Sequence, residues 1–366
     1  MNPAWNPRIL WQRFVAPIDI PLLVIAAILL LIALAMVGSA SPERINNQLI
    51  NIGFALVVMR IVAQVPPQRL MNLALPIFIV GVLLLVGVAL FGDISKGARR
   101  WLNLGFVRVQ PSEIMKIAMP LMLAWYFEKR EARLRLSDYL AAAILLLIPT
   151  ALIARQPDLG TAILVFAAGF YVIFLAGLPW KIIVGTAIAA AGAMPLAWGM
   201  LHDYQRARIL TLLDPQTDPL GKGFHIIQST IAIGSGGILG KGWGQGTQVQ
   251  LEFIPERHTD FIFSVLSEEF GLLGNIVLLV IYALLIGRGM MIAAQAPTLF
   301  SRLLAGSITL VFFTYAFVNM GMVSGILPVV GVPLPFVSYG GTALVTLFIG
   351  IGVLMSIHRN RMLVQK

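Results

Sequence analysis

Cysteine is missing from the 366-residue sequence, and charged residues make up only 11% of it. Without cysteine the chain has no disulfide, no thiolate ligand for a metal ion and no cysteine nucleophile. So few charges cannot cover the surface of a soluble globule of this length, whereas apolar residues supply 58% of the positions and the mean hydropathy is +0.89. Lipid must therefore cover much of the protein.

The apolar residues gather in runs of about twenty, each long enough to cross a hydrocarbon core about 30 Å thick. We predict an all-α, polytopic integral membrane protein with about ten transmembrane helices, which forms a single transmembrane domain over residues 1–366. The predicted spans are 19–40, 46–65, 70–91, 111–127, 138–154, 158–177, 180–201, 259–287, 301–321 and 336–357.

Basic residues in the short loops predict the orientation, because such loops stay on the cytoplasmic side. The basic residues concerned are Arg8, Arg13, Arg69, Lys129, Arg130, Arg133, Arg135, Arg359, Arg361 and Lys366. Ten spans then place both termini in the cytoplasm. Segments 92–110 and 202–258 face outward, and the second is a large extracytoplasmic loop between spans 7 and 8.

Acidic residues are outnumbered, 16 against 26 basic ones, which gives a net charge of +10. We expect no nucleic acid partner, because no basic stripe interleaved with aromatic residues occurs on a soluble segment. The large outward loop nevertheless carries Arg206, Arg208 and Lys241. Cations on that side predict an anionic ligand, namely phosphate or pyrophosphate.

A glycine-rich stretch, 234–246, lies in the same loop. Gly240-Lys241 resembles part of a phosphate-binding loop, but the leading glycine and the trailing serine or threonine of that motif are absent. We therefore predict a backbone that folds tightly over the outer mouth, with Trp243 as an interfacial anchor. A phosphate cradle is the less favoured interpretation.

Charges inside predicted spans are informative, because each costs about 2.5 kcal/mol or more unless it is paired or faces a wet cavity. Glu113 and Lys116 are three residues apart in the fourth span and share one helix face, so we predict an ion pair that lines a polar cavity. Asp158 follows Arg155 in a hairpin between spans 5 and 6. It is predicted to cap a helix, with a catalytic role as the alternative.

The densest group of ionisable residues is Pro255-Glu256-Arg257-His258-Thr259-Asp260-Phe261, where the large loop ends. The structural interpretation makes Thr259 or Asp260 the helix cap, Glu256 and Arg257 a solvated pair, and His258 an interfacial side chain. The functional interpretation places Asp260 in the first helical turn, where the helix dipole favours an ionised carboxylate that can act as a general base or cation ligand.

That carboxylate favours one class of reaction. Hydrolysis of a glycosidic bond usually needs two carboxylates, because the departing alcohol must be protonated. Transfer of a sugar carried on pyrophosphate needs only a base for the incoming hydroxyl and cations for the departing phosphates. A divalent cation such as Mg²⁺ or Mn²⁺ could assist, although the motif offers no dedicated ligand set and the metal stays unknown. Glu268 and Glu269, two turns further on, are predicted to be structural.

The longer motifs resemble those of the SEDS family of bacterial membrane proteins, nearly end to end, and its elongation branch more than its division branch. The motifs are Ser95–Leu102, Gln110–Glu113, Ala154–Thr161, Asp214-Pro215, Pro219–Gly221, Gly223–Ser229, Pro255–Phe261 and Leu327–Gly341.

The resemblance implies a peptidoglycan glycosyltransferase that polymerises lipid II outside the bacterial cytoplasmic membrane during cell elongation. It implies that Asp260 is the essential aspartate, and that Glu113, Lys116 and Asp158 line the central cavity. It also implies a class B penicillin-binding protein as the partner, within the elongation machinery that maintains rod shape.

Two other functions remain open at this stage. A lipid II flippase fits ten spans with buried charges, but its key charges should lie near the membrane midplane rather than at the outer mouth. A noncatalytic scaffold for the penicillin-binding protein would not need Asp260.

Overall fold

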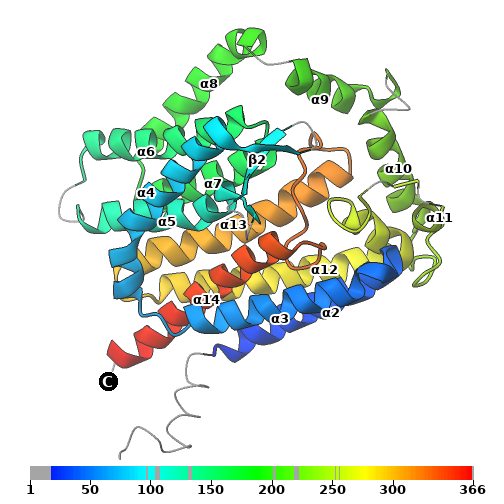
Figure 1. The fold of residues 1–366 in the computed structure, drawn as a ribbon, viewed down its shortest axis with the longest axis horizontal. Helices are drawn as coiled ribbons and strands as arrows, with labels where there is room; N and C mark the ends of the chain where they lie inside the picture. The colour runs from blue at the N-terminus through cyan, green and yellow to red at the C-terminus, as the bar shows by residue number, and fades with distance from the viewer. Residues whose placement is uncertain are drawn as a thin grey trace, which may run out of the picture.

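The computed structural model describes residues 18–95, 98–103, 108–130, 134–200, 203–217, 222–251, 253–254 and 256–364. The described part of the chain is 79% helical with almost no strand. Ten long helices form a bundle (Figure 1), and each coincides with one predicted span. They are α2 (Ile20–Ala40), α3 (Ile45–Val62), α4 (Pro67–Phe91), α5 (Pro111–Glu128), α6 (Leu136–Arg155), α7 (Leu159–Leu175), α8 (Trp180–Met200), α12 (Ile262–Ala294), α13 (Leu299–Val323) and α14 (Gly341–Val364).

Short elements fill the loops. They are η2 (Pro42–Arg44), the antiparallel strands β1 (Asp93–Ser95), β2 (Ala98–Asn103) and β3 (Arg108–Val109), then α9 (Asp203–Leu213), η3 (Pro215–Thr217), α10 (Lys222–Ser235) and α11 (Thr247–Gln250). The predicted large loop between spans 7 and 8 is therefore largely helical in its described part.

Seven helices of the described part are long and apolar enough to cross a membrane, and α7 and the first part of α8 are shorter apolar helices. The remaining long helix, α5, carries Glu113, Lys116 and Glu128. The predicted all-α, polytopic membrane fold is confirmed.

Two predicted boundaries are wrong. The eighth span was expected over 259–287, but α12 covers Ile262–Ala294, and α14 begins at Gly341 rather than 336. Both segments begin as turns, and in the second the Ser338 hydroxyl accepts from the Leu334 amide at 2.8 Å. The N-cap of α12 is Phe261 without a side-chain hydrogen bond, so neither Thr259 nor Asp260 is its cap, and Asp260 precedes the first helical turn.

Helix α13 is the centre of the bundle. It packs against α12, α7 and α5, and it is the most deeply buried of the apolar helices over its described length. Figure 1 shows it passing through the middle of the molecule. In contrast, α8 lies at the margin, and most of its described side chains are exposed.

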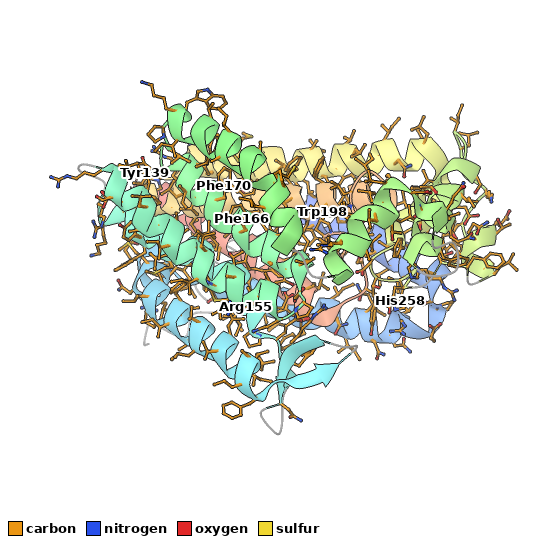
Figure 2. All side chains as sticks on the ribbon, turned by 90° about the horizontal axis from the view of Figure 1, so that it is seen from above. Tyr139, Arg155, Phe166, Phe170, Trp198 and His258 are labelled. Carbon is orange, nitrogen blue, oxygen red and sulfur yellow. The ribbon has the colours of Figure 1, made fainter. Side chains whose placement is uncertain are left out.

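The two ends of the bundle carry different groups of elements. At one end Asp19 ties three helices together, because it accepts from Arg288 at 2.6 Å and lies 3.4 Å from His358. The start of α2 and the end of α14 lie there (Figure 1). At the other end, which we call the loop end, lie α9 to α11. In Figure 2, Tyr139 and His258 mark these two ends.

Candidate functional site

The segment Glu256–Phe261 is fastened to the loop that joins α13 to α14. The Tyr339 amide donates to the His258 carbonyl at 2.8 Å. The Ser338 hydroxyl donates to the Thr259 carbonyl at 2.6 Å. These bonds hold the predicted motif in place through its backbone.

Asp260 is fixed by a buried amide. Asn319 of α13 has no exposed surface, and its Nδ2 donates to the Asp260 carbonyl at 2.8 Å and to the Val332 carbonyl at 2.7 Å. Gly331 lies against the carboxylate, since a Cβ added there would stand 3.4 Å from Asp260 Oδ2. The carboxylate therefore lies over glycine backbone at a position set by α13.

The N-terminus of α7 meets the same loop from another side. A Cβ at Gly160 would stand 2.7 Å from the Val330 carbonyl oxygen, so the two backbones are in close contact. The predicted cap is confirmed: Asp158 accepts from the Thr161 amide at 3.3 Å, and Gln110 Nε2 donates to its other oxygen at 3.1 Å. Asp158 and Asp260 thus flank residues 330–332.

Arg155 lies beside the strands in Figure 2, and Arg100 of β2 donates to the Pro157 carbonyl. The hairpin that carries Asp158 is therefore held by the strand segment between α4 and α5.

The predicted ion pair is present and belongs to a larger buried group. Lys116 Nζ lies 2.6 Å from Glu113 Oε1 and donates to the Tyr315 hydroxyl at 2.6 Å. The Thr346 hydroxyl donates to the other Glu113 oxygen at 3.0 Å. The chain Thr346–Glu113–Lys116–Tyr315 joins α14, α5 and α13, and it satisfies both charges inside the bundle.

Glu113 also borders a cavity. It is about 640 Å³ in volume and lies between α3, α4, α5 and α14. Apolar side chains line most of it, and Gln110, Glu113 and Thr346 supply polar groups. The face of α5 that carries Glu113 therefore borders a cavity, but this cavity is mostly apolar and is not the polar cavity predicted from the charges.

Arg44 was missed by the sequence reasoning. It lies 5.2 Å from the centre of the Tyr339 ring, which packs edge-on against His258 at 5.6 Å. Burial lowers the pKa of His258 below its usual value, the Arg44 and Arg257 cations act in the same direction, and the Glu256 carboxylate opposes them. The side chains of Arg44, Tyr339 and His258 therefore lie together, and His258 is two residues from Asp260 in the chain.

The three loop cations predicted to bind an anion have different surroundings. Lys241 pairs with the buried Glu268 at 2.7 Å. Arg206 donates to the carbonyls of Trp198 and Gly199, at 3.1 and 2.8 Å, and so covers the end of α8. The side chain of Arg208 lies outside the described residues.

Glu256 and the two deeper glutamates also have partners. Glu256 adopts a left-handed backbone conformation, with φ of 50°, and its carboxylate and carbonyl accept from the Thr259 hydroxyl at 3.3 and 3.1 Å. Glu268 accepts from Lys241, Thr247 and the Gln248 amide, and Glu269 accepts from Ser39. Glu268 and Glu269, which were predicted to be structural, thus each have at least one side-chain partner.

No group of three or more histidine, aspartate or glutamate side chains that could hold a metal ion occurs among the described residues. A Mg²⁺ or Mn²⁺ ion here would take most of its oxygen ligands from substrate phosphates and water, as Mg²⁺ commonly does.

Comparison with known proteins agrees with the motifs. The chain is 51% identical to peptidoglycan glycosyltransferase MrdB of Escherichia coli K12, over all of this chain and 99% of that protein. It is 39% identical to a probable peptidoglycan glycosyltransferase FtsW of Geobacter metallireducens, over 75% of this chain and 73% of that protein.

Solved structures give the same result. The rod shape determining protein RodA of Thermus thermophilus is 31% identical with a TM-score of 0.71, over 94% of this chain and 97% of that one. A chain from the structure described as "Structural coordination of polymerization and crosslinking by a peptidoglycan synthase complex" is 38% identical with a TM-score of 0.81, over 94% of this chain and 98% of that one. The family model FTSW_RODA_SPOVE, described as "Cell cycle protein", matches residues 8–363. The chain belongs to this family.

Proposed function

We propose that the protein is a peptidoglycan glycosyltransferase of the elongation branch, which polymerises lipid II at the outer face of the bacterial cytoplasmic membrane. Full-length identity of 51% to MrdB supports the activity and the branch. The observation that carries the proposal is the Asp260 carboxylate, which Asn319 holds by its backbone over Gly331.

Asp260 acts as the general base in this mechanism. Its carboxylate takes the proton from the 4-hydroxyl of the acceptor N-acetylglucosamine as that oxygen attacks the anomeric carbon of N-acetylmuramic acid on the growing strand. The new glycosidic bond forms as the bond to the pyrophosphate oxygen breaks, and configuration inverts at the anomeric carbon. The lipid pyrophosphate leaves as an anion, so no second carboxylic acid is needed to protonate it.

The other groups at the loop end bind and orient substrate. Glu113 lines the cavity and holds Lys116, Asp158 caps α7, and Glu256 and His258 precede the base in the same segment. Arg206, Arg208 and Lys241 were predicted to attract pyrophosphate, and Arg44 joins them because its guanidinium lies near His258. Lys241 and Arg206 have protein partners, and the Arg44 guanidinium lies 3.8 Å from the Glu43 carboxylate.

The proposed topology places the loop end outside and both termini in the cytoplasm. The ends of the described chain lie together at the opposite end of the bundle, in agreement with this arrangement (Figure 1). We also propose a class B penicillin-binding protein of the elongation machinery as the crosslinking partner. Similarity to a chain of a synthase complex that combines polymerization and crosslinking supports a partner of this kind.

The test is the variant Asp260→Asn, reconstituted with the penicillin-binding partner whose transpeptidase is blocked and supplied with purified lipid II. Amide and carboxylate have nearly the same shape, so loss of the base should lower the rate by about 10²–10⁴-fold without unfolding the protein. Glycan strands are resolved on a gel. Asp214→Asn, which neutralises an exposed carboxylate elsewhere in the large loop, is the matched control.

Two results would contradict the proposal. If Asp260→Asn makes strands at the normal rate, Asp260 is not the base. If the unmodified protein makes no strands but moves lipid II across vesicle membranes, the flippase interpretation replaces the enzyme. A reaction without either protein excludes a contaminating polymerase.

A further inference from the structure

The glycine-rich segment does not close over the site, but lies along a break in helix α12. Gly271 has φ of 62° and ψ of −157°, which interrupts the helix nine residues after it begins at Ile262. The segment that follows α10 lies against this break. The two backbones are so close that a Cβ at Gly240 would stand 2.1 Å from the Glu269 carbonyl oxygen.

Backbone hydrogen bonds join the two segments. Leu272 and Leu273 donate their amides to the carbonyls of Gly237 and Ile238, at 2.9 and 3.0 Å. In return, Lys241 and Gly242 donate to the carbonyls of Glu268 and Glu269, both at 3.0 Å. The polar backbone groups released by the broken helix are thus paired with the turn. Irregular backbone becomes compatible with a lipid environment when its polar groups are satisfied in this way.

The tip of this turn, Gly236–Gly240, is apolar and projects from the protein. Ile238 is 71% exposed and Leu239 is 76% exposed. Leu272 and Leu273, which bond to the turn, are also exposed and begin the row of exposed apolar side chains along α12. The tip is therefore continuous with the surface by which α12 faces the hydrocarbon.

Polar contacts lie just beyond the tip. Lys241 binds Glu268, and the Trp243 indole donates to the Ala35 carbonyl at the end of α2 at 2.9 Å. Tryptophan is the residue that commonly marks the boundary between hydrocarbon and headgroups. The sequence of apolar tip, lysine and tryptophan matches a turn that enters a membrane from its surface.

We propose that the turn Gly236–Gly240 is embedded in the acyl chains of the leaflet at the loop end, with Ile238 and Leu239 in contact with lipid. This surface binds lipid hydrocarbon rather than substrate phosphate, which separates it from the phosphate-loop interpretation of the same glycines. The lipid contact does not depend on the proposed function.

A consequence for the reaction does rest on the proposed function. After the turn, the chain forms α11, and Arg257 donates to the Val249 carbonyl at 3.1 Å and to the Ala40 carbonyl at 2.7 Å. Arg257 lies three residues before Asp260. The embedded turn is thus connected to the candidate base through α11 and Arg257. This connection sets the depth of Asp260 relative to the membrane surface. A lipid-linked sugar carries its pyrophosphate at that surface.

The absence of cysteine makes the test direct, because each variant carries one unique thiol. Ile238→Cys and Leu239→Cys are spin-labelled in the full chain and reconstituted in phosphatidylethanolamine–phosphatidylglycerol vesicles. Power saturation then measures collisions of the label with oxygen, which concentrates in hydrocarbon, and with a water-soluble nickel chelate. Leu284→Cys, exposed in the middle of α12, is the lipid reference, and Gln216→Cys, exposed in the large loop, is the water reference.

We expect the ratio of oxygen to nickel collisions at both test positions to shift from the Gln216 value toward the Leu284 value. Nickel collisions as frequent as at Gln216 would overturn the proposal, because the tip would then lie in water. Few collisions with both reagents would also overturn it, because a second copy or another protein would then cover the tip. Two independent test positions guard against one variant that fails to fold, and size-exclusion chromatography identifies such a variant.

Discussion

Asn319 donates one side-chain amide group to the carbonyls of both Asp260 and Val332, and so joins the segment of the candidate base to the loop beneath it. Asn319 is 59 residues from Asp260 in the sequence, on the central helix α13. The position of the base is therefore a property of the helix packing, and removal of this amide should affect the reaction although Asn319 cannot touch the reacting atoms.

We expect Asn319→Leu to lower the rate of glycan polymerisation by about 10²-fold, since small displacements of a catalytic group have effects of this size. The affinity for lipid II should change little. Loss of the amide also removes the donor to the buried Val332 carbonyl, at about 1–3 kcal/mol. The measurement is kcat and KM in the reconstituted polymerisation assay, together with thermal unfolding.

The matched control is Ser229→Ala. Its hydroxyl also donates to a carbonyl of α13, that of Val323, at 2.9 Å, but on the side of α10. This variant should lose stability without a specific loss of kcat. Equal effects of the two variants on kcat would show that Asn319 has only a general structural role.

Gly331→Ala tests the space below the carboxylate. Gly331 has φ of 75°, a conformation that costs an alanine about 1–2 kcal/mol, and the new Cβ would stand 3.4 Å from Asp260 Oδ2. Gly325→Ala is a close control, because its φ is 74° and its Cβ would meet only methyl groups of Ile226 and Thr230. Both variants should lose similar stability, and Gly331→Ala alone should lose most of its polymerisation activity. Similar activities would contradict the assignment of Asp260.

Glu113 and Lys116 should depend on each other. Each single substitution, Glu113→Gln or Lys116→Met, leaves the other residue as an unpaired buried charge. This should lower the free energy of unfolding by about 3–5 kcal/mol. The exchange Glu113→Lys with Lys116→Glu should recover part of the folded yield, since the hydroxyls of Thr346 and Tyr315 can donate or accept. A double-mutant cycle on yield and activity measures the coupling. Lack of any recovery would favour independent roles.

His258 should make the loop end sensitive to acid. Its pKa in the folded protein is lowered by burial and by Arg44 and Arg257, against the opposing carboxylates of Glu256 and Glu43. The unfolded chain then binds the proton more readily, so this contribution to stability is complete above the ordinary histidine pKa of about 6.5 and is lost as pH falls through the lowered value. Between pH 7.5 and 5, the melting temperature of the unmodified protein should fall more steeply than that of His258→Gln. Parallel curves would refute this.

The sequence was sufficient to predict the membrane spans and the contacts between residues that are close in sequence. Long apolar runs report membrane helices directly, and the spacing of Glu113 and Lys116 places them on one helix face without knowledge of the fold. The cap at Asp158 likewise depends on neighbours in sequence. The start of α12 was misplaced because the apolar character continues through Phe261, and only the contacts of His258 and Thr259 with the 338–339 segment keep these residues in a turn.

Contacts distant in sequence were not predictable from pattern. Nothing in the segment around Arg44 indicates Tyr339, and nothing around Lys241 indicates Glu268 as its partner. Both pairs form because helices pack in one particular arrangement. The glycine-rich segment was predicted to fold tightly, which is correct, but its partner is the break at Gly271, a glycine that is inconspicuous within a long apolar run.

Tyr315 and Asn319 lie one turn apart on α13, about 6 Å along its axis. Tyr315 holds Lys116, and Asn319 holds the Asp260 segment. One rigid element therefore sets two parts of the site. A neighbour that rotates or slides α13 would withdraw both hydrogen bonds in a single movement, so activity would fall as an all-or-none response to the position of one helix rather than by the independent loss of each residue.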